Sequence, residues 1–195
     1  HTFELLPGSS AYFKYTYTVT EGDIALGKVV NVVTASGEEG TEGDTDTEIV
    51  TPSSPTKILD VEKTEKSTPA TNGKYVLGEK IEYMVTVTNI GNQTVEQANI
   101  TDVVNKDEIK ELEGFIIKEA TIVDSQGNAV LDESGKEQKV QLSTHTFELL
   151  PGSSAYFKYT YTVRETDITL GTVLNVVTAT GEEGTTPDTD TETVI

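Results

Sequence analysis

Three polar residues interrupt strand faces that are otherwise apolar, and their types suit one covalent reaction. Lys63 and Asp102 each follow two apolar residues at alternate positions, and Asn175 lies between two valines at alternate positions. Alternate residues of a β-strand share a face, so all three side chains are expected to point into an apolar core. A buried lysine is costly unless it is paired or neutral, which makes this trio the candidate site. The flanking apolar residues are Leu59 and Val61, Ala98 and Ile100, and Val173 and Val177.

The chemistry open to this trio is an intramolecular isopeptide bond between Lys63 and Asn175, promoted by Asp102. Burial lowers the pKa of a lysine and raises that of an aspartic acid, which favours a free amine beside a proton donor. Asp102 would polarise the side-chain carbonyl of Asn175, the amine would attack, and ammonia would leave. Folding supplies the proximity, for which effective molarities reach ~10⁵ M. The reaction would occur once per domain, so no turnover enzyme is expected.

A structural interpretation of the same residues stays open. Lys63 and Asp102 would then form a buried, hydrogen-bonded ion pair, and Asn175 would hold a backbone bulge. The two interpretations differ in mass, because only the isopeptide bond releases ammonia.

The elements that position these residues recur along the chain. Residues 1–19 read HTFELLPGSSAYFKYTYTV, and 145–163 repeat this string. The match continues at the same offset of 144 residues through NVVTA and the acidic run DTDTE. A period this long indicates an array of whole domains and not a solenoid of small motifs. We expect the C-terminal third of a repeat at 1–50, a linker at 51–56 and one nearly complete repeat at 57–195.

Alternating apolar residues bounded by Gly and Asn predict short antiparallel strands in the longer repeat. The first strand is expected to begin near Lys57, and turns are expected at 89–92, 124–128 and 133–136. The charged segment 105–114 is expected to hold one helical turn. Roughly seven to nine short strands at this spacing predict an all-β fold, an immunoglobulin-like antiparallel β-sandwich.

Composition excludes several classes of partner and site. Lys and Arg number 14 against 33 Asp and Glu, so nucleic acid and anionic lipid are expected to be repelled. The absence of cysteine excludes disulfides, thiolate metal sites and a cysteine nucleophile. No apolar run approaches the ~18 residues of a membrane span, so no membrane insertion is expected of this piece. Targeting and anchoring segments are expected to lie outside it.

Acidic residues at alternate positions near the repeat ends are the one candidate for a cofactor site. In the second copy they are Asp188, Asp190 and Glu192. Hard oxygen ligands in this pattern could hold Ca²⁺ between repeats and stiffen the array. An EF-hand loop is absent, and alternate side chains on a strand usually face water. We therefore expect no cofactor, with Ca²⁺ as the alternative.

Three motifs resemble the tandem "conserved repeat" domains of bacterial, especially Gram-positive, surface proteins. They are VTVTNIGNQTVEQANITDVV at 85–104, FELLPGSSAYFKYTYTV at 147–163 and GTVLNVVTATG at 171–181. The resemblance covers all of 57–195 and, through its second half, 1–50. It implies an immunoglobulin-like sandwich, an extracellular location at the bacterial cell surface or wall, and a role in stalks or adhesins without enzymatic activity.

The sandwich also resembles collagen-adhesin-type domains, in which intramolecular isopeptide bonds are known. A bond of this kind would tie the first strand to a late strand, in the role that disulfides fill in other secreted domains. The chain departs from the shorter family members by an insertion at 105–142.

Two functions are expected from this organisation. The first is a structural spacer, in which neighbouring repeats of the same protein are the partners. The alternative is an adhesive module that contacts a host protein or glycan through repeated weak sites. The Tyr-rich strand at 12–17, repeated at 156–161, is the candidate adhesive patch, and its alternation fits a core strand equally well.

The incomplete repeat at 1–50 is expected to need a partner. It carries Asn31, the counterpart of Asn175, without the early strands that would supply a matching Lys and Asp. Its unpaired edges and apolar face are therefore expected to pair with another copy of the chain by strand exchange.

Overall fold

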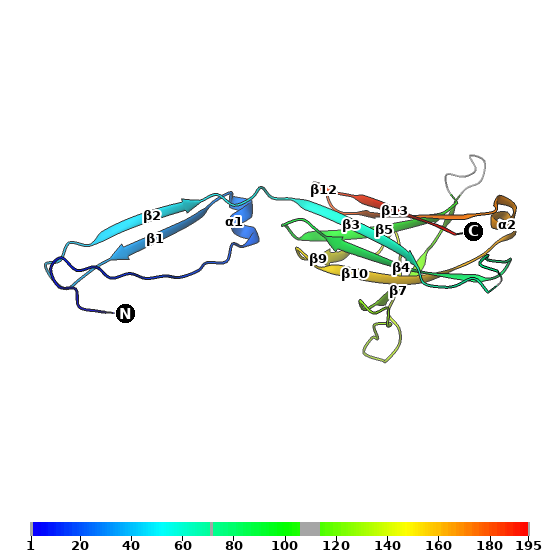
Figure 1. Cartoon of the computed structure of the whole chain (residues 1–195), viewed down its shortest axis with the longest axis horizontal. Coiled ribbons are helices and arrows are strands. Elements are labelled where there is room, and N and C mark those ends of the chain that lie inside the picture. Colours follow the sequence, from blue (N-terminus) through cyan, green and yellow to red (C-terminus); the bar gives the residue numbers. More distant parts are fainter. Residues whose placement is uncertain (1, 71, 106–113, 195) are drawn as a thin grey trace. The chain divides into compact units, whose positions relative to one another are not determined.

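A computed structural model describes residues 2–70, 72–105 and 114–194 and divides the chain into two compact units (Figure 1). Unit 1 is His1–Ser54 and unit 2 is Pro55–Ile195. Within the described part of the chain, no helix is long and apolar enough to cross a membrane.

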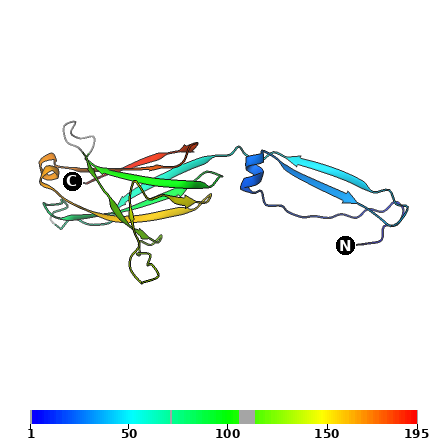
Figure 2. The same ribbon diagram turned by 180° about the vertical axis from the view of Figure 1, so that it is seen from behind.

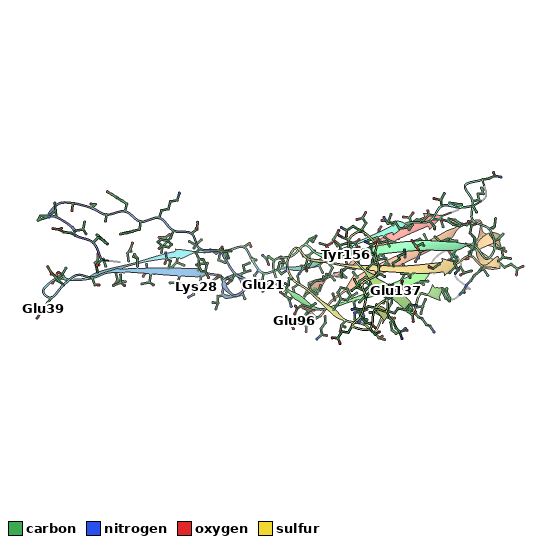
Figure 3. All side chains as sticks on the ribbon, turned by 90° about the horizontal axis from the view of Figure 1, so that it is seen from below. Glu21, Lys28, Glu39, Glu96, Glu137 and Tyr156 are labelled. Atoms are coloured by element: carbon green, nitrogen blue, oxygen red, sulfur yellow. The ribbon has the colours of Figure 1, made fainter. Side chains whose placement is uncertain are left out.

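Unit 1 consists of one short helix and one hairpin. Helix α1 (Glu21–Leu26) precedes strands β1 (Val29–Ala35) and β2 (Asp44–Val50), which pair antiparallel. Beyond its first residue every side chain of β1 is exposed, as is all of β2. Figure 3 shows the side chains of this hairpin extending outward without a second sheet over them.

Unit 2 carries the larger fold, most of it in strands. Its elements are β3 (Lys57–Glu65), β4 (Lys80–Asn89), β5 (Val95–Val104), β6 (Phe115–Ile116), β7 (Glu119–Val123), β8 (Lys139–Gln141), β9 (Phe147–Leu149), β10 (Ser154–Thr162), α2 (Glu165–Leu170), β11 (Val173–Thr180), β12 (Thr185–Thr186) and β13 (Asp188–Val194).

These strands form two layers that enclose one core (Figures 1 and 2). One sheet has the order β12-β3-β4-β10-β7-β8, and the other has the order β13-β11-β5-β6 with β9 also paired to β5. All pairings are antiparallel except that of β12 with β3. The prediction of an all-β chain with antiparallel sheets is confirmed.

Alternation along the strands builds the core. Every second residue is buried in β4, in β11 and in β5 from Ala98 onward, and the residues between them are mostly partly exposed. Because the apolar residues occupy the buried positions, each strand buries one apolar face against the opposite sheet. The largest fully buried apolar side chains are Tyr83, Phe157, Ile81, Ile100, Val85, Val87, Val95, Val104 and Val177.

The predicted turns are present where the structure describes them. Strand β4 ends at Asn89, whose buried amide donates to the carbonyls of Gln93 and Leu149 and so fixes the turn. Tight turns also occur at 124–127 and 132–135. The helical turn expected at 105–114 falls almost entirely outside the described residues.

Candidate functional site

Lys63, Asp102 and Asn175 come from three strands and both sheets, and all three are buried. Their relative exposures are 4%, 0% and 0%. Lys63 lies on β3, while Asp102 and Asn175 lie on the neighbouring strands β5 and β11 of the other sheet. In the β5–β11 pairing Asp102 is opposite Val177, two positions along β11 from Asn175. Both side chains therefore share the inner face as diagonal neighbours, and Lys63 contacts Asp102 from the opposite sheet.

The Lys63 amine and the Asp102 carboxyl form a closed hydrogen-bonded triangle with a tyrosine. Lys63 Nζ donates to Asp102 Oδ2 and to the hydroxyl of Tyr159, which donates to the same Oδ2. The side chains of Lys63 and Asp102 have no solvent-accessible surface. Water therefore has no access to the pair.

Two aromatic rings enclose the amine. Lys63 Nζ lies 4.7 Å from the ring centroid of Tyr83 and 4.9 Å from that of Tyr159. The two rings are 5.8 Å apart. Neither tyrosine was among the expected site residues, because each belongs to a run of alternating core residues that marks a buried face and not its contacts.

The site shifts the pKa values of Lys63 and Asp102 toward each other. Burial lowers the pKa of Lys63 to about 8, against the opposing effect of the Asp102 charge. Burial raises the pKa of Asp102, against the opposing effects of Lys63 and of the hydrogen bond from Tyr159. A neutral amine beside a protonated carboxyl is thereby brought closer in free energy to the ion pair.

The Asn175 side chain is buried without a hydrogen-bond partner. Within the described residues neither its Nδ2 nor its Oδ1 completes a hydrogen bond, and Asp102 Oδ1 is also unpartnered. The amide is nonetheless close enough to Asp102 and Tyr159 to counter the effect of burial on the pKa of each. An unpaired buried amide is costly and needs an explanation.

The backbone at Asn175 offers no such explanation. Strand β11 pairs in continuous register with β13 on one side and with β5 on the other. No bulge is present at this position for Asn175 to hold.

The acidic residues of β13 join this strand to β3. Asp188 Oδ2 accepts from the Val61 N–H at 2.9 Å, and Asp190 Oδ2 accepts from the Lys63 N–H at 2.7 Å. Glu192 and Asp190 also favour the charged form of Lys63 electrostatically. Among the described residues no group of three or more acidic or histidine side chains is placed to hold a metal ion.

Of the three site residues, only Asn175 has a counterpart in unit 1, which is Asn31. Asn31 Nδ2 donates to the hydroxyl of Tyr15 at 2.5 Å, and the Tyr17 hydroxyl donates to Asp23 at 2.8 Å. The second of these bonds matches the one from the Tyr161 hydroxyl to Asp167 at 2.7 Å in unit 2.

Comparisons with known proteins place the chain in no family. No family model matches it, and no curated protein matches it. Among solved structures, the sporulation control protein Spo0M from Bacillus subtilis is 16% identical to this chain, with a TM-score of 0.35. The match covers 70% of this chain and 48% of the Spo0M chain. This chain therefore spans about half of Spo0M.

Two further structures have similarly low scores. The putative ApaA protein from Bordetella pertussis is 13% identical with a TM-score of 0.38, covering 72% of this chain and 94% of its own. AvmM, which catalyses macrocyclization in alchivemycin A biosynthesis, is 13% identical with a TM-score of 0.36, covering 69% of this chain and 88% of its own. Likeness at this level supports no statement about function.

Proposed function

We propose that this chain is a spacer repeat from the stalk of an extracellular bacterial surface protein. Its immunoglobulin-like sandwich is reinforced by a self-formed isopeptide bond between Lys63 and Asn175. The observation that carries the proposal is the unpartnered, fully buried Asn175 amide beside a buried Lys63–Asp102 pair that spans both sheets.

The reaction needs only groups that the site contains. A proton moves from Lys63 Nζ to Asp102, which leaves a neutral amine beside a protonated carboxyl. The amine attacks Cγ of Asn175 while Asp102 donates a hydrogen bond to Oδ1, so that a new N–C bond forms. The bond from Cγ to Nδ2 then breaks, and the nitrogen leaves as ammonia with a proton from the attacking amine.

Two features of the site favour this step over a permanent ion pair. Burial of the amine away from solvent disfavours its charged form, which lowers the cost of making it neutral, although the faces of the two tyrosine rings attract a cation. The bond would also remove the unpartnered Nδ2 of Asn175 from the core. Formation of the bond therefore relieves the cost that the amide imposes.

A bond at this place suits a load-bearing repeat. Lys63 lies on the first strand of unit 2, and Asn175 lies on β11, which is paired with the last strand. Tension on the two ends would pass from β3 through the bond to β11, and the strands between them would carry no load. A covalent link in a chain without cysteine would fill the role of a disulfide.

Two of the three tyrosines in the candidate adhesive strand of the complete repeat are buried. Tyr159 and Tyr161 are 5% and 2% exposed and pack in the core of unit 2, whereas Tyr156 is partly exposed. The burial of these two rings favours the spacer over the adhesive alternative.

Intact-mass spectrometry of the recombinant chain tests the proposal. The expected mass is lower than that calculated from the sequence by one ammonia, about 17 Da. Lys63→Ala and Asp102→Ala should each restore the calculated mass, and Lys66→Ala should keep the loss, because Lys66 is exposed just after β3. A wild-type mass equal to the calculated one would refute the bond.

A further inference from the structure

Unit 1 exposes the apolar face that its counterpart in unit 2 buries. The two segments share their sequence at an offset of 144 residues, and the β1–β2 register repeats that of β11–β13. Phe13, Tyr15 and Val33 are 70%, 64% and 55% exposed, whereas Phe157, Tyr159 and Val177 are 2%, 5% and 0% exposed. The same side chains therefore alternate in the same way in both units, but in the described part of unit 1 no strands cover them.

Unit 2 shows what that cover is. Strand β10 pairs along its whole length with β4, and β11 pairs with β5, so residues 57–144 supply both the strand partners and the opposing face for 145–194. In unit 1 the counterpart of β10 forms no strand. Any segment with the sequence of 57–144 therefore fits the exposed face of 1–50.

We propose that residues 1–50 of one chain dock on residues 57–144 of a second copy, in the place of that copy's own 145–194. Docking would set Asn31 where Asn175 lies in unit 2, beside the Lys63 and Asp102 of the second copy. The covalent part of this inference rests on the proposed function, whereas the docking does not.

Docking within one chain is excluded by the linker. Asp188 and Asp190 contact β3 in parallel order, and Thr185 lies opposite Lys57. From Thr185 to Val194 the chain therefore runs about 30 Å away from Lys57 along β3. Val50, the counterpart of Val194, would have to lie at that far end, yet the chain from Val50 to Lys57 spans at most about 25 Å. A second molecule has no such restriction.

The two late segments compete for one early segment. Because 1–50 and 145–194 are nearly identical in sequence, the contacts they offer to 57–144 are nearly equal. A bond from Lys63 to Asn175 would lock the chain's own segment in place, so exchange must precede that bond. Removing the Asn175 amide would leave Asn31 of another copy as the acceptor.

The covalent step then links two chains. Lys63 Nζ of one copy attacks Cγ of Asn31 in the other, the N–C bond forms, the bond from Cγ to Nδ2 breaks, and ammonia leaves. Each copy keeps a further 1–50 segment for the next chain, so linkage yields oligomers.

Refolding of the full chain from denaturant at high protein concentration tests the inference. Asn175→Ala is expected to give oligomers that resist denaturing electrophoresis, each link carrying a Lys63–Asn31 cross-linked peptide and a loss of about 17 Da. Adding Asn31→Ala should abolish the covalent link. The mass of the wild-type chain, refolded in parallel, shows whether the Lys63–Asn175 bond forms.

A matched pair on β1 tests the docking without relying on the bond. In the Asn175→Ala background, Val33→Lys should abolish oligomers in native mass spectrometry, because its counterpart Val177 is fully buried, and Val32→Lys should not. Both valines are exposed in unit 1, so neither change disturbs its fold. Oligomers that Val33→Lys removes, without loss of ammonia, would support docking and refute the bond. Monomers from Asn175→Ala beside a wild-type chain that loses ammonia would refute docking alone.

Discussion

At the scale of single residues, the Lys63 amine couples the site to pH. Its pKa falls from 10.5 to about 8 on folding, chiefly because burial disfavours the charged form. Between these two values the unfolded chain binds more protons than the folded chain at this position. The free energy of unfolding should therefore rise as pH rises from about 8 to 10.

This prediction applies to a chain in which Lys63 is unbonded. In Asn31→Ala/Asn175→Ala, which has neither acceptor amide, the free energy of unfolding is expected to increase by up to ~3 kcal/mol over that interval, measured by chemical denaturation. Adding Lys63→Met to this variant retains Asp102, Tyr83 and Tyr159 and should remove this increase. Equal slopes in the two variants would contradict a neutral amine in the folded site.

The sequence supported the inward direction of the three site residues but not their surroundings. Period-two alternation assigns Lys63, Asp102 and Asn175 to inner faces, and all three are buried. Alternation cannot say which side chains meet across the core, because that depends on the offset between sheets. The contacts of Tyr83 and Tyr159 with Lys63 depend on that offset and were not predictable.

At the scale of elements, side chains of β13 close the gap between two sheet edges. Asp190 accepts from the N–H of Lys63, so it fixes the backbone that carries the Lys63 amine. Period-two alternation identifies Asp188 and Asp190 as one face of a strand. It does not reveal that this face meets the N–H groups of β3, a contact between residues far apart in sequence.

Asp190→Ala should destabilise unit 2 because it leaves the N–H of Lys63 without its acceptor. The expected cost is about 1–3 kcal/mol in the free energy of unfolding, measured by denaturant titration. Asp46→Ala is the matched control, since Asp46 occupies the same position in unit 1 and accepts from the N–H of Thr47. A similar cost for both changes would show that the contact with β3 contributes nothing.

The pattern of apolar residues in the sequence does not predict the two short helices, for a physical reason. A helix of six residues, such as α2, completes too few turns to display an apolar period. Helix α2 is held in place by Asp167, which is 3% exposed and accepts from the Tyr161 hydroxyl and from the N–H of Arg164. Such a contact is local in the chain, but an Asp among Thr and Glu residues does not stand out as buried.

At the scale of the whole molecule, the internal repeat was the strongest signal in the sequence. An identical string at two positions identifies matching segments before any strand is assigned, and β1–β2 and β11–β13 pair in the same register. The repeat could not indicate that the two copies differ in burial. Burial depends on the early strands of unit 2, which pack against 145–194 within that unit.

When the two ends of the chain are pulled apart, the bond should reduce the length to which the chain extends. If Lys63 is joined to Asn175, the chain between them cannot extend, and at about 3.5 Å per residue it withholds about 390 Å of extension. Single-molecule pulling on the wild-type chain should therefore show a shorter final contour length than pulling on Lys63→Ala, by that amount. Lys66→Ala should behave as the wild type, because it leaves the reacting amine in place. Equal contour lengths for wild type and Lys63→Ala would mean that hydrogen-bonded sheets alone carry the load, and the chain would then be a spacer without covalent reinforcement.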